Sequence, residues 1–285
     1  MTQIHSTAIV STSAELGEDV VIGAYCVVGP HVKIGRGTRL HNHVTIAGHT
    51  RIGSGNVIYP QAILGLEPQD LKYHGEAAEL VIGDGNVIRE LVTMHIGTEN
   101  GGNVTRIGNH NLIMVSCHIA HDCVLGDHII MANGVSLAGH VVVEDHANIG
   151  GLAGVHHFVT FGKHCFMGGM ARVSKDVPPF MIGEGNPVEM RSINVIGLER
   201  AGISEVSISR LKHAHQLLYR PKGSDPSTQA ERLALLAGLY PEDEQVGYLV
   251  DFLKKSHENS FGRYRESLRK DPRHRRPADA VAGKK

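Results

Sequence analysis

The sequence of 285 residues contains no tryptophan, and aromatic residues make up only 5% of it. A core built around large aromatic rings is therefore not expected. Long apolar stretches are also absent, since no run of about 18 apolar residues occurs. The N-terminus does not begin with a basic segment followed by an apolar one. We therefore expect neither a membrane-spanning helix nor a secretory signal. A cytoplasmic protein is expected instead.

An excess of charge of either sign is missing as well, because the formal net charge is −1. This balance gives no electrostatic reason to expect a nucleic acid or an anionic membrane as a partner. Glycine, by contrast, is abundant at 34 residues, which favours many tight turns between short elements.

The dominant pattern is an internal repeat of six residues. It runs from Ile4 to Ile63, resumes for three hexads from Ile82, and then continues from Ile107 to Pro178. All 25 hexads begin with Ile, Leu, Val, Met or Phe, and the fifth position is Ala, Val, Cys, Thr or Asn in 24 of them. This pattern fits short strands joined by tight turns, with both positions facing the inside of a narrow prism. We predict a parallel β-helix with three hexads, or 18 residues, in each coil.

The cysteines all occupy the small fifth position of a hexad, at Cys26, Cys117, Cys123 and Cys165. This placement predicts buried side chains that pack as small apolar groups. Disulfides and metal ligands are not expected from them, given the cytoplasmic context.

Two segments interrupt the repeat. Residues 64–81 contain the polar run Gln69 to Glu76, and we predict a loop that leaves the solenoid and carries binding groups. Residues 99–106 are rich in Gly and Asn, which predicts a turn extension.

A different pattern follows the repeat. Helical periodicity is found in residues 204–219, 228–239 and 246–255. We assign residues 1–190 to the β-helix, residues 191–270 to an α-helical domain that caps its open end, and residues 271–285 to a disordered basic tail.

Histidines gather on one edge of the predicted prism. Adding one coil to His121 gives Gly139, and a second coil gives His157. Strands of neighbouring coils lie about 4.8 Å apart, so these positions should stack, together with the adjacent His140 and with His118 close by. None of these histidines occupies an inward position, so all should project outward. Three roles therefore remain possible for these histidines: exposed surface residues without a function, metal ligands, or catalytic residues.

The same edge has the parts of an acyl-transfer site. An imidazole oriented by a carboxylate is a suitable general base near neutral pH, and His121 is followed directly by Asp122. The N–H of Gly139 can approach a substrate carbonyl closely and stabilise an oxyanion. Because the nearby cysteines face inward, we expect direct attack by a substrate hydroxyl rather than an acyl-enzyme.

Several motifs together resemble one known family. The hexads, QDLKYHGE, CHIAHDC, LAGHV, AGVHHF, KDVPP and the helical C-terminus are similar to those of the bacterial UDP-N-acetylglucosamine O-acyltransferases, over roughly residues 4 to 220. The resemblance implies a left-handed parallel β-helix, and a homotrimer with active sites between subunits. It implies transfer of an (R)-3-hydroxyacyl chain from acyl carrier protein to the glucosamine 3-position, the first step of lipid A synthesis. No metal or cofactor is implied beyond the phosphopantetheine that the carrier protein brings.

The resemblance also assigns roles to residues of this chain. It implies His121 as the general base, Asp122 as its acid partner and Gly139 as the oxyanion donor. Substrate contacts are implied for Gln69, Asp70, Lys72, His95, His118, His140, His156, His157, Gly169, Asn194 and Arg200. Of these, Gly169 matches a position that limits acyl-chain length, and a glycine there suggests a long chain.

The sequence departs from the family pattern at His157, Ala201 and Pro187. These positions bear on the nucleotide and pantetheine contacts and on the identity of the sugar. The sequence therefore leaves open the acyl-chain length and the choice between a 3-hydroxyl and a 3-amino acceptor.

Other functions fit parts of the pattern. An N-acyltransferase of the same pathway is expected to carry a separate domain before its hexads, whereas here they begin at Ile4. An acetyl-CoA-dependent hexapeptide enzyme is a further alternative within the class. A trimeric zinc carbonic anhydrase would use His118 and His121 as ligands, and stoichiometric zinc is expected only for that enzyme. The dense row of outward histidines disfavours a scaffold without activity.

Overall fold

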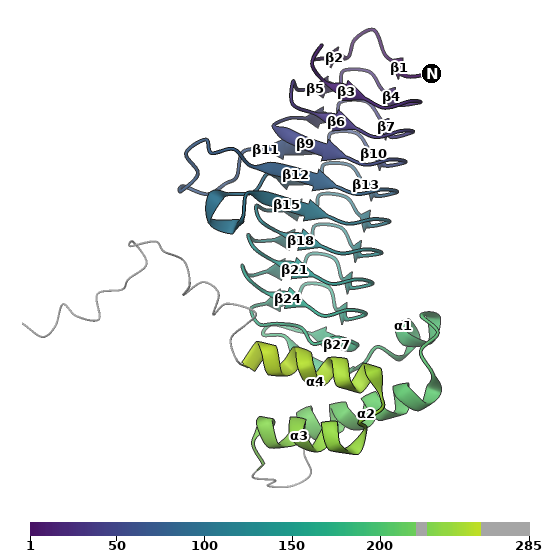
Figure 1. The fold of residues 1–285 in the computed structure, drawn as a ribbon, viewed down its shortest axis with the longest axis vertical. Coiled ribbons are helices and arrows are strands. Elements are labelled where there is room, and N and C mark those ends of the chain that lie inside the picture. Colours follow the sequence, from purple (N-terminus) through teal and green to yellow (C-terminus); the bar gives the residue numbers. More distant parts are fainter. Residues whose placement is uncertain (221–226, 258–285) are drawn as a thin grey trace, which may run out of the picture.

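The computed structural model describes residues 1–220 and 227–257 (Figure 1). Short parallel strands form a long column, and helices lie at the end of that column (Figure 1). The predicted basic tail, residues 271–285, lies outside the described residues.

Every third strand of the column belongs to the same sheet, so the column is a prism with three faces. The first sheet contains β1 (Gln3–Ile4), β4 (Val21–Ile22), β7 (Arg39–Leu40), β10 (Val57–Ile58), β13 (Val87–Ile88), β16 (Leu112–Ile113), β19 (Ile130–Met131), β22 (Asn148–Ile149), β25 (Phe166–Met167), β27 (Met181–Glu184) and β28 (Glu189–Ile193). The second sheet contains β2 (Ile9–Val10), β5 (Val27–Val28), β8 (Thr45–Ile46), β11 (Ile63–Leu66), β14 (Thr93–His95), β17 (His118–Ile119), β20 (Ser136–Leu137), β23 (Gly154–Val155) and β26 (Arg172–Val173). The third sheet contains β3 (Glu15–Leu16), β6 (Lys33–Ile34), β9 (His49–Ile52), β12 (Glu79–Ile82), β15 (Val104–Ile107), β18 (Val124–Leu125), β21 (Val142–Val143) and β24 (Thr160–Phe161).

The register of these strands confirms the predicted coil length. Val124 pairs with Val142, and Val142 pairs with Thr160, so equivalent residues of neighbouring coils are 18 apart. The strands of the column pair in parallel, and the antiparallel pair of β27 and β28 ends the first sheet. The predicted boundary at residue 190 falls inside β28.

The core of the column consists of the first and fifth positions of the hexads. The four cysteines are buried and free, as predicted, and pack among aliphatic side chains such as Ile113 and Val159. At the N-terminal end, the first-position residue Ile4 is 48% exposed because no earlier coil covers it. The aliphatic repeat is therefore buried by stacking, coil on coil, rather than within a single coil.

Both interruptions leave the prism at the same corner, between the second and third sheets. The loop of residues 67–78 joins β11 to β12, so the predicted interruption at 64–81 was too long at both ends. The second interruption contains a short 3-10 helix, η1 (Glu99–Gly101), and β15 begins within the predicted range. The two loops lie side by side on one side of the column (Figure 1), and the Glu99 N–H donates a 3.4 Å hydrogen bond to Glu76 Oε1.

The helices are α1 (Val195–Arg200), α2 (Glu205–Tyr219), α3 (Gln229–Leu239) and α4 (Glu244–His257). Three agree with the predicted segments, and Ser204 and Thr228 are the N-caps of α2 and α3. Their apolar faces form a second core with Phe180 and Met181, so they cap the open end of the prism as predicted. Within the described residues, these helices are too short and too polar to cross a membrane.

Stacking makes each inward aliphatic residue part of two coil interfaces. Ile88 is fully buried, so Ile88→Ala should lower the free energy of unfolding by about 2–5 kcal/mol through lost contacts and a cavity. The matched control Ile9→Ala removes the same atoms from an exposed position and should cost much less. Urea denaturation followed by circular dichroism compares the two, and equal losses would contradict this account of the core.

Candidate active site

The corner between the second and third sheets carries the predicted histidines. We call it the site corner, and it consists of residues 67–78, 96–103, 120–123, 138–141 and 156–159. A groove of about 520 Å³ lies along the second sheet beside it. Five of the predicted site residues line this groove, namely Gln69, His118, His121, Gly139 and His156. The stacking expected from the 18-residue period is therefore present, and the 67–78 loop reaches the same groove.

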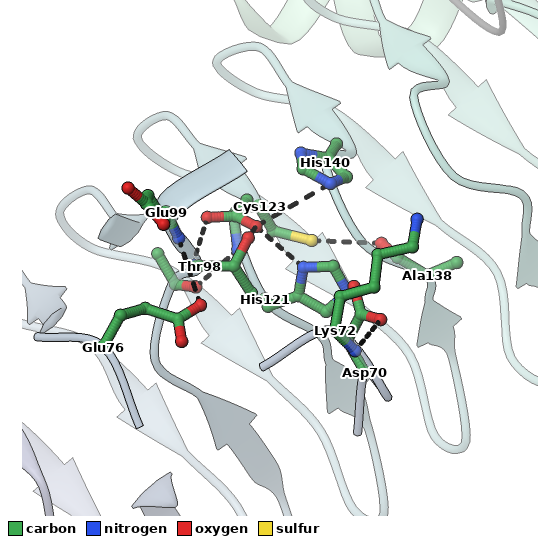
Figure 2. A network of polar contacts seen from close by, with 11 residues as sticks. Asp70, Lys72, Glu76, Thr98, Glu99, His121, Cys123, Ala138 and His140 are labelled. Carbon is green, nitrogen blue, oxygen red and sulfur yellow. Dashed lines mark hydrogen bonds and ion pairs between the residues drawn. The ribbon is translucent and has the colours of Figure 1, made fainter. Parts of the chain in front are cut away.

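His121 and Asp122 form a close pair in the site corner, and Figure 2 shows the polar contacts around His121. His121 Nδ1 lies 2.7 Å from Asp122 Oδ2, and the two side chains are 11% and 0% exposed. Because an ionised carboxylate only accepts hydrogen bonds, Nδ1 carries the proton in this pair. The lone pair of Nε2 is then left for a substrate, and this atom lies 3.8 Å from Asp70 Oδ2.

Asp122 is held in the ionised form by its hydrogen bonds. Burial alone would raise the pKa of this carboxyl, but hydrogen bonds from His121 and Thr98 outweigh burial and hold the pKa below its usual value. Thr98 donates its N–H to Oδ1 at 2.7 Å and its hydroxyl to Oδ2 at 2.6 Å. The Asp122 N–H donates to Thr105 Oγ1 at 2.8 Å, which supports the left-handed backbone of this residue at φ 61°.

His140 lies on the far side of the same carboxylate. Its Nε2 is 3.7 Å from Asp122 Oδ2, and its ring stands at 89° to that of His121 with centroids 5.1 Å apart. The ring of Phe158, one coil further on, stacks against His140 at 4.5 Å. These contacts fix His140 as a buried neighbour of the pair.

A second pair of histidines, His95 and His118, lies beside the first, and His118 lines the groove. The rings of His95 and His118 meet edge to face at 4.9 Å, and His118 Nδ1 lies 2.7 Å from Thr93 Oγ1. Burial, with repulsion from His118 and His121, lowers the pKa of His95 to about 4. Burial and the nearby His121 lower the pKa of His118 as well. Both rings are therefore neutral in the neutral pH range.

Gly139 lies directly under the His121 ring. A Cβ at this position would be 2.5 Å from His121 Cε1 and 2.7 Å from Nε2, too close for any side chain. A glycine is therefore required for His121 to keep its position. The Gly139 N–H has no hydrogen-bond partner among residues 1–220 and 227–257.

Equivalent N–H groups at another corner bind carboxylate or amide oxygens. We call this the carboxylate corner, between the third and first sheets. There the N–H groups of Ser54, Asp84, Asn109 and Asp127 each donate to the side chain of the residue at the same position in the next coil, at 2.6–2.8 Å. At the site corner the next coil places His157 in that position, which has no carboxylate. The Gly139 N–H is thus equivalent to donors that this fold directs at side-chain carboxylate and amide oxygens.

One expectation about these histidines needs correction. His121 and His140 lie outside the prism, but they do not project into solvent, since both are buried. The two interrupting loops cover them, with Asp70 on one side and Thr98 on the other. His156 and His157 contact each other, with ring centroids 3.8 Å apart, and are half-buried.

Three predicted residues are not near His121 in this chain. Asn194 and Arg200 line a separate groove of about 580 Å³, between the first sheet and α1. Gly169 is exposed at the corner between the first and second sheets. Lys72 does join the cluster, since its N–H donates to Asp70 Oδ1 at 3.1 Å (Figure 2).

Sequence reasoning missed several residues around the two grooves. Thr93, Thr98 and Thr105 hold the histidines and Asp122, but the second interruption obscures which residues of the next coil they face. A stack of four rings on the carboxylate corner was also missed, although its spacing of 18 is visible in the sequence. It consists of His110, His128, His146 and His164, with centroids 4.6–5.2 Å apart.

The structure bears on two other chemical possibilities. Burial raises the pKa of Cys117 to about 11 and that of Cys123 to about 12, so neither thiol is a ready nucleophile. His121, Asp122 and His140 have donor atoms within 4.8 Å of one another, a spacing that could hold a metal ion. However, Asp122 Oδ2 already lies at hydrogen-bond distance from both His121 and Thr98, so the group is arranged as a hydrogen-bonded acid–base pair.

Comparisons with known proteins found relatives in sequence and in structure. A family profile described as UDP N-acetylglucosamine O-acyltransferase, domain 2, matches residues 176–261, and one for bacterial transferase hexapeptides matches residues 13–48. The acyl-(acyl-carrier-protein)–UDP-N-acetylglucosamine O-acyltransferases of Synechocystis and Gloeothece citriformis are 50% and 47% identical over 213 residues, 75% of this chain and of each relative. The solved UDP-N-acetylglucosamine O-acyltransferase of Moraxella catarrhalis is 41% identical with a TM-score of 0.84, covering 89% of this chain and 97% of that one. The expected left-handed parallel β-helix is confirmed.

The low pKa of His95 makes stability depend on pH. In an unfolded chain His95 is protonated below about pH 6.5, whereas in the native protein it is protonated only near pH 4. The free energy of unfolding should therefore fall as the pH is lowered across this window. We expect His95→Gln to make that fall shallower, by up to about 1.4 kcal/mol per pH unit. Urea denaturation at several pH values tests this, with the exposed His5→Gln as control. Parallel curves for wild type and His95→Gln would contradict it.

Proposed function

The chain belongs to the UDP-N-acetylglucosamine O-acyltransferase family, and on this basis we propose that it transfers an (R)-3-hydroxyacyl chain from acyl carrier protein to the glucosamine 3-position of UDP-N-acetylglucosamine. The reaction is the first step of lipid A synthesis. The observation that carries the proposal is the buried His121–Asp122 pair beside the Gly139 N–H, which lines the groove and has no hydrogen-bond partner among the described residues.

His121 is the general base of this reaction. Its protonated Nδ1 faces Asp122, so Nε2 removes the proton from the acceptor O3, or from N3 of a 3-amino sugar. The acceptor atom then attacks the thioester carbonyl carbon. When the tetrahedral intermediate collapses, the C–S bond breaks, and the imidazolium of His121 protonates the departing pantetheine thiolate. Both halves of the reaction therefore use one proton and one ring nitrogen.

The negative charge of the intermediate forms beside Gly139. The equivalent N–H groups of the carboxylate corner bind side-chain oxygens at 2.6–2.8 Å, so an N–H in this position can donate a short hydrogen bond to an oxyanion. Asp122 stabilises the imidazolium that forms at the same time, because it is ionised and buried. The charges that develop during the reaction thus face fixed groups of opposite sign.

The remaining predicted residues have positioning roles in the proposal. His118, His140, His156 and the loop residues around Asp70 surround the groove in which the two substrates meet. Neutral His95 and His118 add hydrogen-bonding capacity without a positive charge that would compete with His121. A metal ion has no part in the proposed mechanism.

A homotrimer would complete the site. The outward side chains of the first sheet are apolar at Val57, Val87, Leu112 and Ile130, where a solvated sheet would carry polar residues. A second copy would cover this face. It would also bring Arg200 and Asn194, which lie in a groove of their own on this face, towards the His121 groove of a neighbour. The proposed assembly has a mass of about three times 30.8 kDa.

Removal of the base should abolish most of the activity. We expect His121→Ala to lower kcat by about 10² to 10⁴, the usual contribution of a general base. The matched control is His110→Ala, an exposed histidine of the carboxylate corner. Purified protein would be assayed with carrier-protein thioesters of several chain lengths against UDP-N-acetylglucosamine and its 3-amino analogue, with products identified by mass. Normal turnover by His121→Ala would refute the mechanism, and no product from wild type would refute the function.

Mixed trimers test whether neighbouring subunits share a site. His121→Ala and Arg200→Ala chains should each be inactive alone, because each lacks one half of every site. Trimers assembled from an equal mixture should regain activity, with roughly one intact site in four by random assortment. Activity of the co-expressed, co-purified mixture is compared with that of each variant alone. A mixture no more active than its parents would contradict a shared site.

A further inference from the structure

The second interruption folds as a cap on Asp122. We call residues 97–103 the Asp122 cap. The cap is pinned to the third sheet, because the Gly97 N–H donates to Glu79 O at 3.1 Å and the Glu79 N–H donates to Asn103 O at 2.8 Å. Within the cap, the Asn103 N–H donates to Thr98 O at 2.8 Å. The segment therefore has a fixed conformation over the corner that follows it by one coil.

Thr98, labelled in Figure 2, is the residue of the cap that binds the Asp122 carboxylate. Its N–H and its hydroxyl donate to the two different oxygens of Asp122, at 2.7 and 2.6 Å, and Thr98 itself is 3% exposed. With His121 Nδ1 on Oδ2, the carboxylate is held at both oxygens and cannot rotate without losing a charged hydrogen bond. The plane of Asp122 thus fixes the plane and tautomer of the His121 ring.

Gly101 allows the cap to lie this close. A Cβ built on Gly101 would overlap the Cγ and both carboxylate oxygens of Asp122. The position is not in the left-handed region, so its backbone conformation does not require glycine. The reason for a glycine is therefore the space that Asp122 occupies.

We propose that Thr98 and Gly101 are positioning residues for the acyl-transfer reaction, which hold the Asp122 carboxylate in the orientation that aligns His121. Neither touches the groove, so both act through Asp122. The inference rests on the proposed function of His121 and Asp122 as the base and its partner. It gives the second interruption a role in catalysis, beyond that of a turn extension.

Thr98→Val and Thr98→Ser form the first test. Valine keeps the shape but loses the hydroxyl, and kcat should fall about tenfold, as expected for a lost hydrogen bond to a buried charge. With one donor fewer, the His121–Asp122 pair binds a proton more readily, so the acid limb of the kcat/KM profile should move to higher pH. Serine keeps the hydroxyl and should restore both. KM for the sugar nucleotide should stay unchanged throughout.

A control separates this role from a loss of stability. Thr38 is also buried, and its hydroxyl donates to Gly53 O at 2.8 Å and accepts from the Asn56 N–H, far from the site. Thr38→Val should therefore destabilise the fold without moving the acid limb. The proposal is overturned if Thr98→Val keeps the wild-type kcat and acid limb, or if Thr98→Ser behaves like Thr98→Val.

Gly101→Ala provides an independent second test. Its methyl group must displace either the cap or Asp122, and kcat should fall at least as far as in Thr98→Val. Gly238→Ala is the control, because a Cβ there meets open space on α3. Wild-type kcat in Gly101→Ala would overturn the proposal. If wild type itself produced no acylated sugar nucleotide, the proposed function would fail instead, so the two failures are distinguishable.

Discussion

Parallel pairing at a fixed interval of 18 residues is the constraint on which the rest of the structure depends. Each residue of a turn is stacked against its counterpart in the next coil, as His121 is against Gly139. The backbone thus supplies a ladder of equivalent positions along each corner of the prism. The register also decides which residues the small fifth positions and the outward histidines contact, since their neighbours belong to other coils.

This regularity explains which features could be predicted from the sequence. The prism, its buried cysteines and the meeting of His121 with Gly139 and His140 all follow from counting in sixes and eighteens. The count fails where an interruption of unknown path intervenes. The repeat of six predicts that Thr98 is a fifth position and faces the inside of the prism. In the structure, Thr105 takes that inward position, where it pairs with Leu80 of the preceding coil. Only the path of the cap shows that Thr98 lies against Asp122.

Other parts could not be predicted for different reasons. The helix α1 has six residues with a glycine inside it, too short to give a periodic signal. The burial of His121 depends on the paths of the two interrupting loops, and its outward position in the hexad does not show that these loops cover it. The positions of Asn194 and Arg200 follow from how the capping helices fold back on the first sheet, which periodicity does not encode.

The same backbone N–H group has a structural role at one corner and, in the proposed mechanism, a catalytic role at the other. On the carboxylate corner, side chains such as Asp127 and Asp145 accept hydrogen bonds from the N–H groups of the preceding coil and so join neighbouring coils. At the site corner, His157 takes the place of such a carboxylate, and the Gly139 N–H has no hydrogen-bond partner in the part of the chain that the structure describes.

The interrupting loops add what the bare ladder lacks. An outward histidine on a smooth prism would be solvated, and its attraction to a carboxylate would be weakened by water. Here the loops of residues 67–78 and 97–103 cover the pair, and burial makes an ionised Asp122 costly unless it is fully bonded. Thr98 and His121 provide those bonds, so the same contacts that make the buried charge tolerable also fix its direction. The site is therefore set up by the coil that precedes it as much as by the coil that contains it.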